Sequence, residues 1–94
     1  MDYGLANIEV NDFQQKIFKY ISRRIPGTAY TFKYYTRDNY CCASCFKLGK
    51  IRSVTVRNNR IVVQKDPEDG HHLNCHPIAE ETGMNWLVYF LYNF

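Results

Sequence analysis

The sequence predicts a small α+β fold that is mostly β: a four-stranded antiparallel sheet with a metal ion at one end, flanked by an N-terminal helix and an apolar C-terminal segment. Three observations lead to this prediction. Apolar and polar residues alternate through the middle of the chain, and four Cys and three His stand in two short groups. The chain has 94 residues, enough for one small core, and such cores commonly need a metal ion or disulfides. We therefore expect a single domain, residues 1–94.

The predicted strands are segments that alternate in polarity or are rich in β-branched residues. They are residues 30–37, 40–42, 50–57 and 61–64. Asp38-Asn39 is a turn signal between the first two strands. Asn58-Asn59 suits a hairpin turn between the last two, because Asn tolerates a positive φ. The four strands therefore form an antiparallel meander.

The N-terminal flank fits two elements. Asn11 or Asp12 could cap a helix that runs to Arg24, where Pro26-Gly27 would end it. The apolar face of this helix would comprise Phe13, Ile17, Tyr20 and Ile21. Residues 16–22 also alternate in polarity as a strand would, but the helix is the preferred interpretation.

The C-terminal flank, residues 78–94, is apolar on every side. We expect it to cover one face of the sheet, or to present residues from Trp86 to Phe94 as a surface for a protein partner or for self-association. Its longest apolar run is far shorter than the roughly 20 residues that span a bilayer. The N-terminal residues lack the basic and apolar regions of a signal peptide. A membrane or secreted protein is therefore disfavoured.

The Cys and His residues have the spacing of a metal site. Cys42-x2-Cys45 and His72-x2-Cys75 are separated by 26 residues and offer four sulfur or nitrogen ligands. Structural Zn²⁺ takes four such ligands in a tetrahedral arrangement. Two disulfides would instead require an oxidising compartment. The sequence therefore predicts one structural zinc ion.

Each group offers more Cys or His residues than the two that the site needs. Cys41 and Cys42 are adjacent, so on a strand they point to opposite faces and only one should reach the ion. Cys42 has the usual two-residue spacing from Cys45, which leaves Cys41 as a small buried residue. His72 is preferred over His71 for the same reason, and His76 is expected to be a loop residue.

The charges are strongly segregated. All twelve Lys and Arg lie within residues 13–65, where Asp38 is the only acid, so this stretch carries a net charge of +11. Segregated basic charge is typical of a surface that binds an anion, and we expect nucleic acid, most simply duplex DNA. A two-stranded ribbon fits the major groove. The predicted DNA contacts are Lys33, Tyr35, Arg37, Lys47, Lys50, Arg52, Arg57 and Arg60.

The order of these residues resembles FLYWCH-type zinc fingers, which belong to the wider WRKY/GCM-like group of zinc-stabilised β-sheet domains. The matching features are an aromatic-x-Cys (Tyr40 and Cys42), a second Cys, a basic β-rich spacer, and a Gly-His-His stretch that ends in Cys-x-Pro. The resemblance covers about residues 28–77. It implies a nuclear DNA-binding module of a transcription- or chromatin-associated protein.

The chain departs from that family in three ways. The family usually has Trp at Tyr40, a longer gap between its first two Cys, and a closing His-x-His instead of His72-x2-Cys75. Similar HxxC closures occur next to transposase-derived sequences. The changes keep ligand types that suit zinc, but the resemblance does not extend to DNA-contact residues.

Other functions fit the sequence less well. A zinc-supported protein-interaction module would use the aromatic residues as its contact surface. Eight Tyr and six Phe could also stack the bases of RNA or of a single strand. No nucleophilic triad or Gly-rich phosphate loop stands out, and the metal site already accounts for the Cys and His residues. We therefore do not expect an enzyme.

Overall fold

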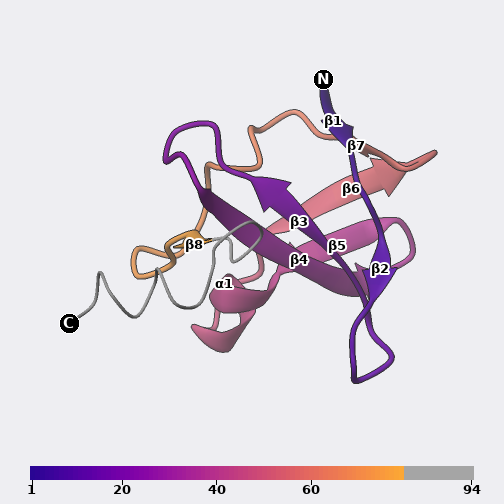
Figure 1. Cartoon of the computed structure of the whole chain (residues 1–94), viewed down its shortest axis with the longest axis horizontal. Helices are drawn as coiled ribbons and strands as arrows, with labels where there is room; N and C mark the ends of the chain where they lie inside the picture. The colour runs from indigo at the N-terminus through magenta and orange to yellow at the C-terminus, as the bar shows by residue number, and fades with distance from the viewer. Residues whose placement is uncertain (80–94) are drawn as a thin grey trace, which may run out of the picture.

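The computed structural model describes residues 1–79, and antiparallel strands make up most of its regular structure (Figure 1). This part of the chain contains eight strands and one short helix. In order they are β1 (Asp2–Leu5), β2 (Glu9–Val10), β3 (Lys16–Ile21), β4 (Thr28–Thr36), β5 (Asn39–Cys42), α1 (Ala43–Lys47), β6 (Ser53–Arg57), β7 (Arg60–Val62) and β8 (Ile78–Ala79).

The strands form a curled sheet in the order β1-β7-β6-β5-β4-β3-β2, and β8 also pairs with β4. The N-terminal segment supplies both ends of this order, because β1 pairs with β7 while β2 pairs with β3. Figure 1 shows this segment in indigo, running past β7 and then past β3. One segment therefore covers parts of two sheet edges that would otherwise expose unpaired backbone groups.

The predicted four-stranded meander is confirmed as β4 to β7, with each strand paired antiparallel to the next. Asn58 and Asn59 form the second hairpin turn, with φ values of 53° and 61°. Two consecutive positive φ values are the signature of the tight turn that best matches strand twist. The first turn lies one residue earlier than predicted, because Thr36 pairs with Asn39 and leaves Arg37 and Asp38 between them.

The predicted N-terminal helix is wrong, because β3 occupies its place. Phe18 and Tyr20 are buried and alternate with the exposed Lys19 and Ile21. β3 pairs with β4 at every position from Ile17 to Ile21. The hydrogen bonds between β3 and β4, together with the burial of two aromatic side chains on one face, outweigh the local preference for a helix. Helix propensity is weak compared with tertiary contacts.

Asn11, one of the two predicted helix caps, forms a turn instead. The side-chain Oδ1 of Asn11 accepts hydrogen bonds from the backbone N–H groups of Phe13, at 2.9 Å, and Gln15, at 3.0 Å. Gln14 has a φ of 62°, which no helix allows. Asn favours both helix caps and turns of this kind, so the residue type alone does not distinguish them.

The core lies inside the curl of the sheet. Phe18 stacks on Phe32 with ring centroids 5.2 Å apart, and it packs edge to face with Tyr40 with centroids 5.3 Å apart. The same cluster of buried residues continues into Cys42 and Cys45. The apolar core and the Cys residues are therefore parts of one packed interior.

Of the predicted apolar C-terminal segment, only Ile78 and Ala79 are described. They form β8 and pair with the start of β4. The predicted partner surface from Trp86 to Phe94 lies outside the described residues. Within residues 1–79, the structure has no helix with the length and apolar character that a membrane span requires.

Phe18→Ala should lower the free energy of unfolding by about 3–5 kcal/mol, because it removes a fully buried ring. Chemical denaturation of the metal-loaded protein measures this change. The matched control is Phe13→Ala, at a side chain that is 84% exposed, which should change stability by no more than about 0.5 kcal/mol. The N-terminal helix would give the opposite order, because Phe13 and not Phe18 would lie on its apolar face.

Candidate metal centre

Three Cys and one His converge at one end of the sheet. The ligand atoms of Cys42, Cys45, His71 and Cys75 all lie within 4.8 Å of one another. The Sγ atoms of Cys42 and Cys75 are 3.7 Å apart, and His71 Nδ1 lies 3.2 Å from Cys45 Sγ and 3.6 Å from Cys75 Sγ. Tetrahedral zinc bonds of about 2.0–2.3 Å place neighbouring ligand atoms roughly 3.5–3.8 Å apart. The four residues could therefore hold one metal ion.

Cys42 and Cys45 reach the cluster from β5 and α1. Cys42 ends β5 and faces the core beside its cross-strand partner Phe32. The helix starts at the next residue, and its single turn returns Cys45 to the same place with no exposed surface. Cys41 is buried but lies outside the cluster, because neighbouring residues on a strand point to opposite faces. The structure thus brings together the Cys pair that the spacing favoured.

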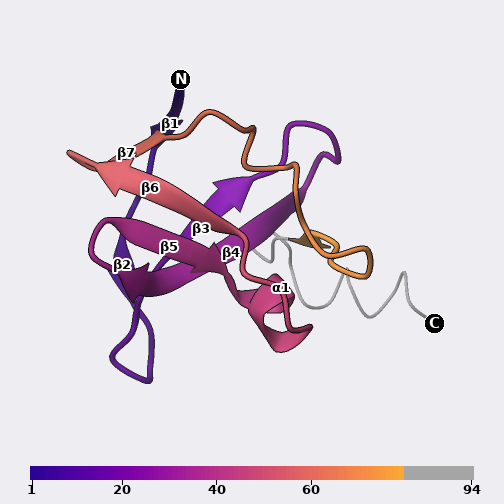
Figure 2. The same ribbon diagram turned by 180° about the vertical axis from the view of Figure 1, so that it is seen from behind.

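The other two residues of the cluster come from the loop that follows β7. Figures 1 and 2 both show this orange segment next to α1. Cys75 is 7% exposed, and its backbone N–H donates to the carbonyl of His72 at 2.8 Å in a tight turn. All four Cys are free thiols. The cluster therefore joins two stretches of chain that are far apart in sequence.

The histidine of the cluster is His71, whereas the sequence favoured His72. The Nε2–H of His71 donates to the Pro67 carbonyl at 2.6 Å, which leaves Nδ1 to face Cys45 and Cys75. Metal-binding histidines are commonly oriented by such a bond from their second nitrogen. The His71 ring also stacks on Tyr30, with centroids 4.2 Å apart. The stacking on Tyr30 is a tertiary contact, and the bond to Pro67 depends on how the loop folds, so the two- and three-residue spacings could not be ranked from sequence.

His72 has different partners. Its backbone N–H donates to Cys45 Sγ at 3.3 Å, and its ring Nδ1 accepts a hydrogen bond from the N–H of Asn74 at 3.0 Å. A backbone N–H that donates to a sulfur stabilises negative charge on that sulfur. His72 therefore contacts the cluster through its backbone, while its ring caps the turn.

Burial favours the uncharged forms of Cys42, His71 and Cys75. It raises the pKa of the Cys42 and Cys75 thiols and lowers the pKa of His71. A neutral imidazole is ready to bind a cation, whereas each thiol must first lose its proton. An ion in the cluster would therefore compete with protons at its sulfur ligands.

Arg52 holds the loop that carries His71. Its Nε donates to the Asp69 carbonyl at 2.6 Å, and its Nη2 donates to the Asp66 carbonyl at 2.9 Å. Nη1 donates to the carbonyl of Ser53. Burial lowers the pKa of Arg52, but these carbonyl acceptors satisfy its guanidinium. This predicted DNA contact is thus turned towards the protein's own backbone.

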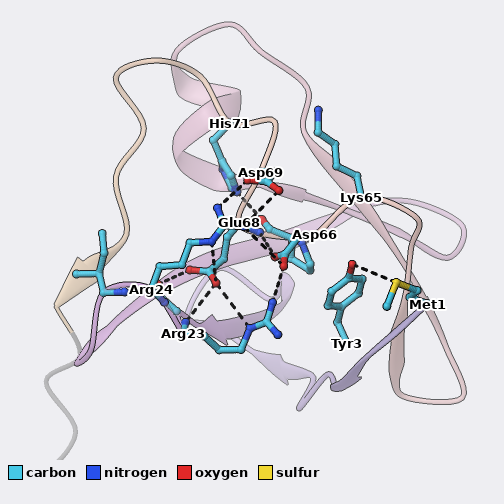
Figure 3. Close-up of polar contacts among 12 residues, drawn as sticks. Met1, Tyr3, Arg23, Arg24, Lys65, Asp66, Glu68, Asp69 and His71 are labelled. Carbon is cyan, nitrogen blue, oxygen red and sulfur yellow. Dashed lines mark hydrogen bonds and ion pairs between the residues drawn. The ribbon is translucent and has the colours of Figure 1, made fainter.

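An ion-pair network that the sequence did not predict lies beside this loop. Arg23 pairs with Asp66, and Arg24 pairs with Asp69 at 2.7 Å (Figure 3). The hydroxyl of Ser22 donates to Glu68, whose side chain is only 2% exposed. The Arg24 hydrogen bond holds the pKa of Asp69 below its usual range. The network ties the turn between β3 and β4 to the loop that carries His71.

The other predicted DNA contacts fall in two groups. Three lie around α1, at Lys33, Lys47 and Lys50, and four lie at the hairpin ends, at Tyr35, Arg37, Arg57 and Arg60. Arg57 lies 3.8 Å from Asp38, and Arg60 is bonded to Asp2. These acidic partners are distant in sequence from the arginines that they neutralise. The count of basic residues therefore overstated the positive charge available to bind DNA.

The fold and the cluster together define a small curled β-sheet domain with a Cys3His site that could bind metal. Comparisons with protein-family models, with curated proteins and with solved structures find no match to this chain.

His71→Ala should weaken metal binding strongly, because it removes a ligand. Loss of a residue that only hydrogen-bonds to a ligand typically costs roughly 10- to 100-fold in affinity, and we expect a larger loss here. Competition with a chromophoric chelator measures the affinity, and absorption of the Co²⁺ form reports the coordination geometry. His72→Ala is the matched control and should retain one ion with a tetrahedral spectrum. A larger loss in the His72 variant would show that His72 is the ligand.

Metal affinity should rise with pH between about 5.5 and 7.5, because burial raises the pKa of the Cys42 and Cys75 thiols and protons compete with the ion. With three thiols to deprotonate, the slope approaches about three decades per pH unit. Chelator competition at several pH values measures it. Cys41→Ser should leave the slope unchanged, and a pH-independent affinity would contradict a thiolate site.

Proposed function

We propose that this chain is a non-catalytic zinc-binding module that binds duplex DNA. Cys42, Cys45, His71 and Cys75 would hold the ion. Three thiolates and an imidazole are a ligand set that suits structural Zn²⁺. Four protein ligands leave no open position for water or substrate, which favours a structural role over catalysis.

The observation that carries the DNA proposal is a set of lysines around α1 that have no acidic partner in the part of the chain that the structure describes. Lys47 and Lys50 are exposed, and Lys33 is half-buried. Within residues 1–79, none of the three forms an ion pair with a carboxylate. Unpaired ammonium groups on a rigid framework attract the phosphates of a nucleic acid. A structural ion would supply the rigidity.

The relation to FLYWCH-type zinc fingers and the nuclear location are part of the same proposal. They rest on the order of aromatic, Cys and His residues in the sequence. The Cys3His cluster is compatible with that order, although its histidine is His71.

A protein-interaction module is the second candidate, and exposed apolar side chains beside the metal centre favour it. Phe46, Leu48 and Ile51 are 43%, 41% and 50% exposed. Apolar side chains gathered near a rigid site are typical of protein contact surfaces. Such a module would bind no duplex at physiological salt, so the DNA experiment also separates the two candidates.

Duplex DNA binding should fall steeply with salt. Three phosphate contacts predict a slope of about −2.7, or roughly a 40-fold loss of affinity between 50 and 200 mM salt. Fluorescence anisotropy with a labelled duplex measures this, with EDTA-treated protein as the control that should not bind. Single-stranded DNA and RNA serve as competitors, and stronger competition by either would assign the domain to unpaired strands. Absence of duplex binding at 50 mM salt would refute the proposal.

A further inference from the structure

The arginines of this domain are largely engaged within the protein. Arg23 and Arg24 pair with acids of the loop that carries His71, and Arg60 is bonded to Asp2. The guanidinium of Arg52 donates to backbone carbonyls. Arg57 lies within 3.8 Å of Asp38. Arginine is the side chain that most often reads guanine, through a planar fork that must be free to approach the base edge.

The lysines around α1 have a different environment. Lys33 Nζ lies 3.8 Å from the centroid of the Phe46 ring, which holds the ammonium group beside the helix without neutralising it. Lys47 is in the last turn of α1, and no described residue bonds its side chain. Lys50 Nζ is 3.5 Å from the His71 carbonyl, at the limit of a hydrogen bond. A protonated lysine is a point charge that suits phosphate oxygens.

The shape of this region also argues against base readout. α1 has five residues, so it is only about 7.5 Å long. Recognition helices place three or four side chains on base edges in the major groove. Of the residues in α1, only Phe46 and Lys47 are exposed, and one of them is apolar. The helix can therefore meet the DNA backbone but is too short to read a site.

We propose, resting on the proposed function, that the domain binds duplex DNA through its phosphate backbone and independently of sequence. Lys33, Lys47 and Lys50 around α1 make the contact. Phosphate contacts position a protein on DNA without carrying sequence information, and they account for most non-specific binding. Of the eight predicted contacts, three thus remain that lie around α1 and have no acidic partner within residues 1–79.

The test compares two variants that each remove two positive charges. K47Q/K50Q changes exposed lysines in and just after α1, and K16Q/R37N changes two exposed residues, one at the start of β3 and one in the turn between β4 and β5. Asn is used at position 37 because Arg37 has a φ of 50°. Zinc content verifies that both variants keep the site, and K33Q/K47Q replaces the first variant if K47Q/K50Q loses the ion.

The wild-type protein should bind an A·T-only duplex, a G·C-rich duplex and a random duplex with affinities within about threefold. The slope of log affinity against log salt should fall by about 1.8 in K47Q/K50Q, at about 0.9 per phosphate contact, and stay unchanged in K16Q/R37N. Selection from a random library should enrich no sequence.

Each contrary outcome has a distinct meaning. Enrichment of a preferred site, or an equal loss of slope in K16Q/R37N, would overturn this inference and leave the proposed function standing. Failure of the wild-type protein to bind any duplex would refute the proposed function itself.

Discussion

The convergence of Cys42, Cys45, His71 and Cys75 is the constraint on which the rest of this domain depends. The core of buried residues is small, and three of its members are these Cys residues. A structural ion contributes on the order of 10 kcal/mol to the folding of zinc-finger peptides. The net stability of a whole domain is only about 5–15 kcal/mol. An ion in this cluster would therefore decide whether a sheet of this size stays folded.

The loop that carries His71 and Cys75 is positioned by the protein itself. Arg52 binds the carbonyls of Asp66 and Asp69, and the Pro67 carbonyl orients the His71 ring. The ion pairs of Arg23 and Arg24 tie the same loop to the neighbouring hairpin. These contacts pre-organise the ligands, so less conformational entropy would be lost when an ion binds.

Arginines hold this loop in place, because their several donors can bind carboxylates and carbonyls in a fixed geometry. The basic groups left on the surface around α1 are lysines, which act as point charges. The chain thus uses most of its arginines to hold its own segments together and, in our proposal, lysines for the external partner. The net charge counted from the sequence includes both kinds of residue, so it does not show which charges are available to a partner.

Local patterns predicted a large share of the fold. The alternation in residues 30–37, the β-branched runs and the Asn58-Asn59 turn were correct for β4 to β7 because each depends on neighbouring residues along the chain. The Cys42-x2-Cys45 pair was predictable for the same reason, since one turn of chain brings both residues to the same point. The N-terminal helix was wrong because Asn11 favours caps and turns equally, and pairing with β4 decided between them.

The sequence by itself determined the mostly β architecture, the four-stranded meander and the presence of a cluster of Cys and His residues. Only the tertiary structure decided that the N-terminal segment covers both ends of the sheet, that His71 faces the three Cys, and that Arg52 faces inward. The physical reason is the range of the interactions. Strand alternation and turns arise between adjacent residues, whereas these features depend on hydrogen bonds and packing between segments that only folding brings together.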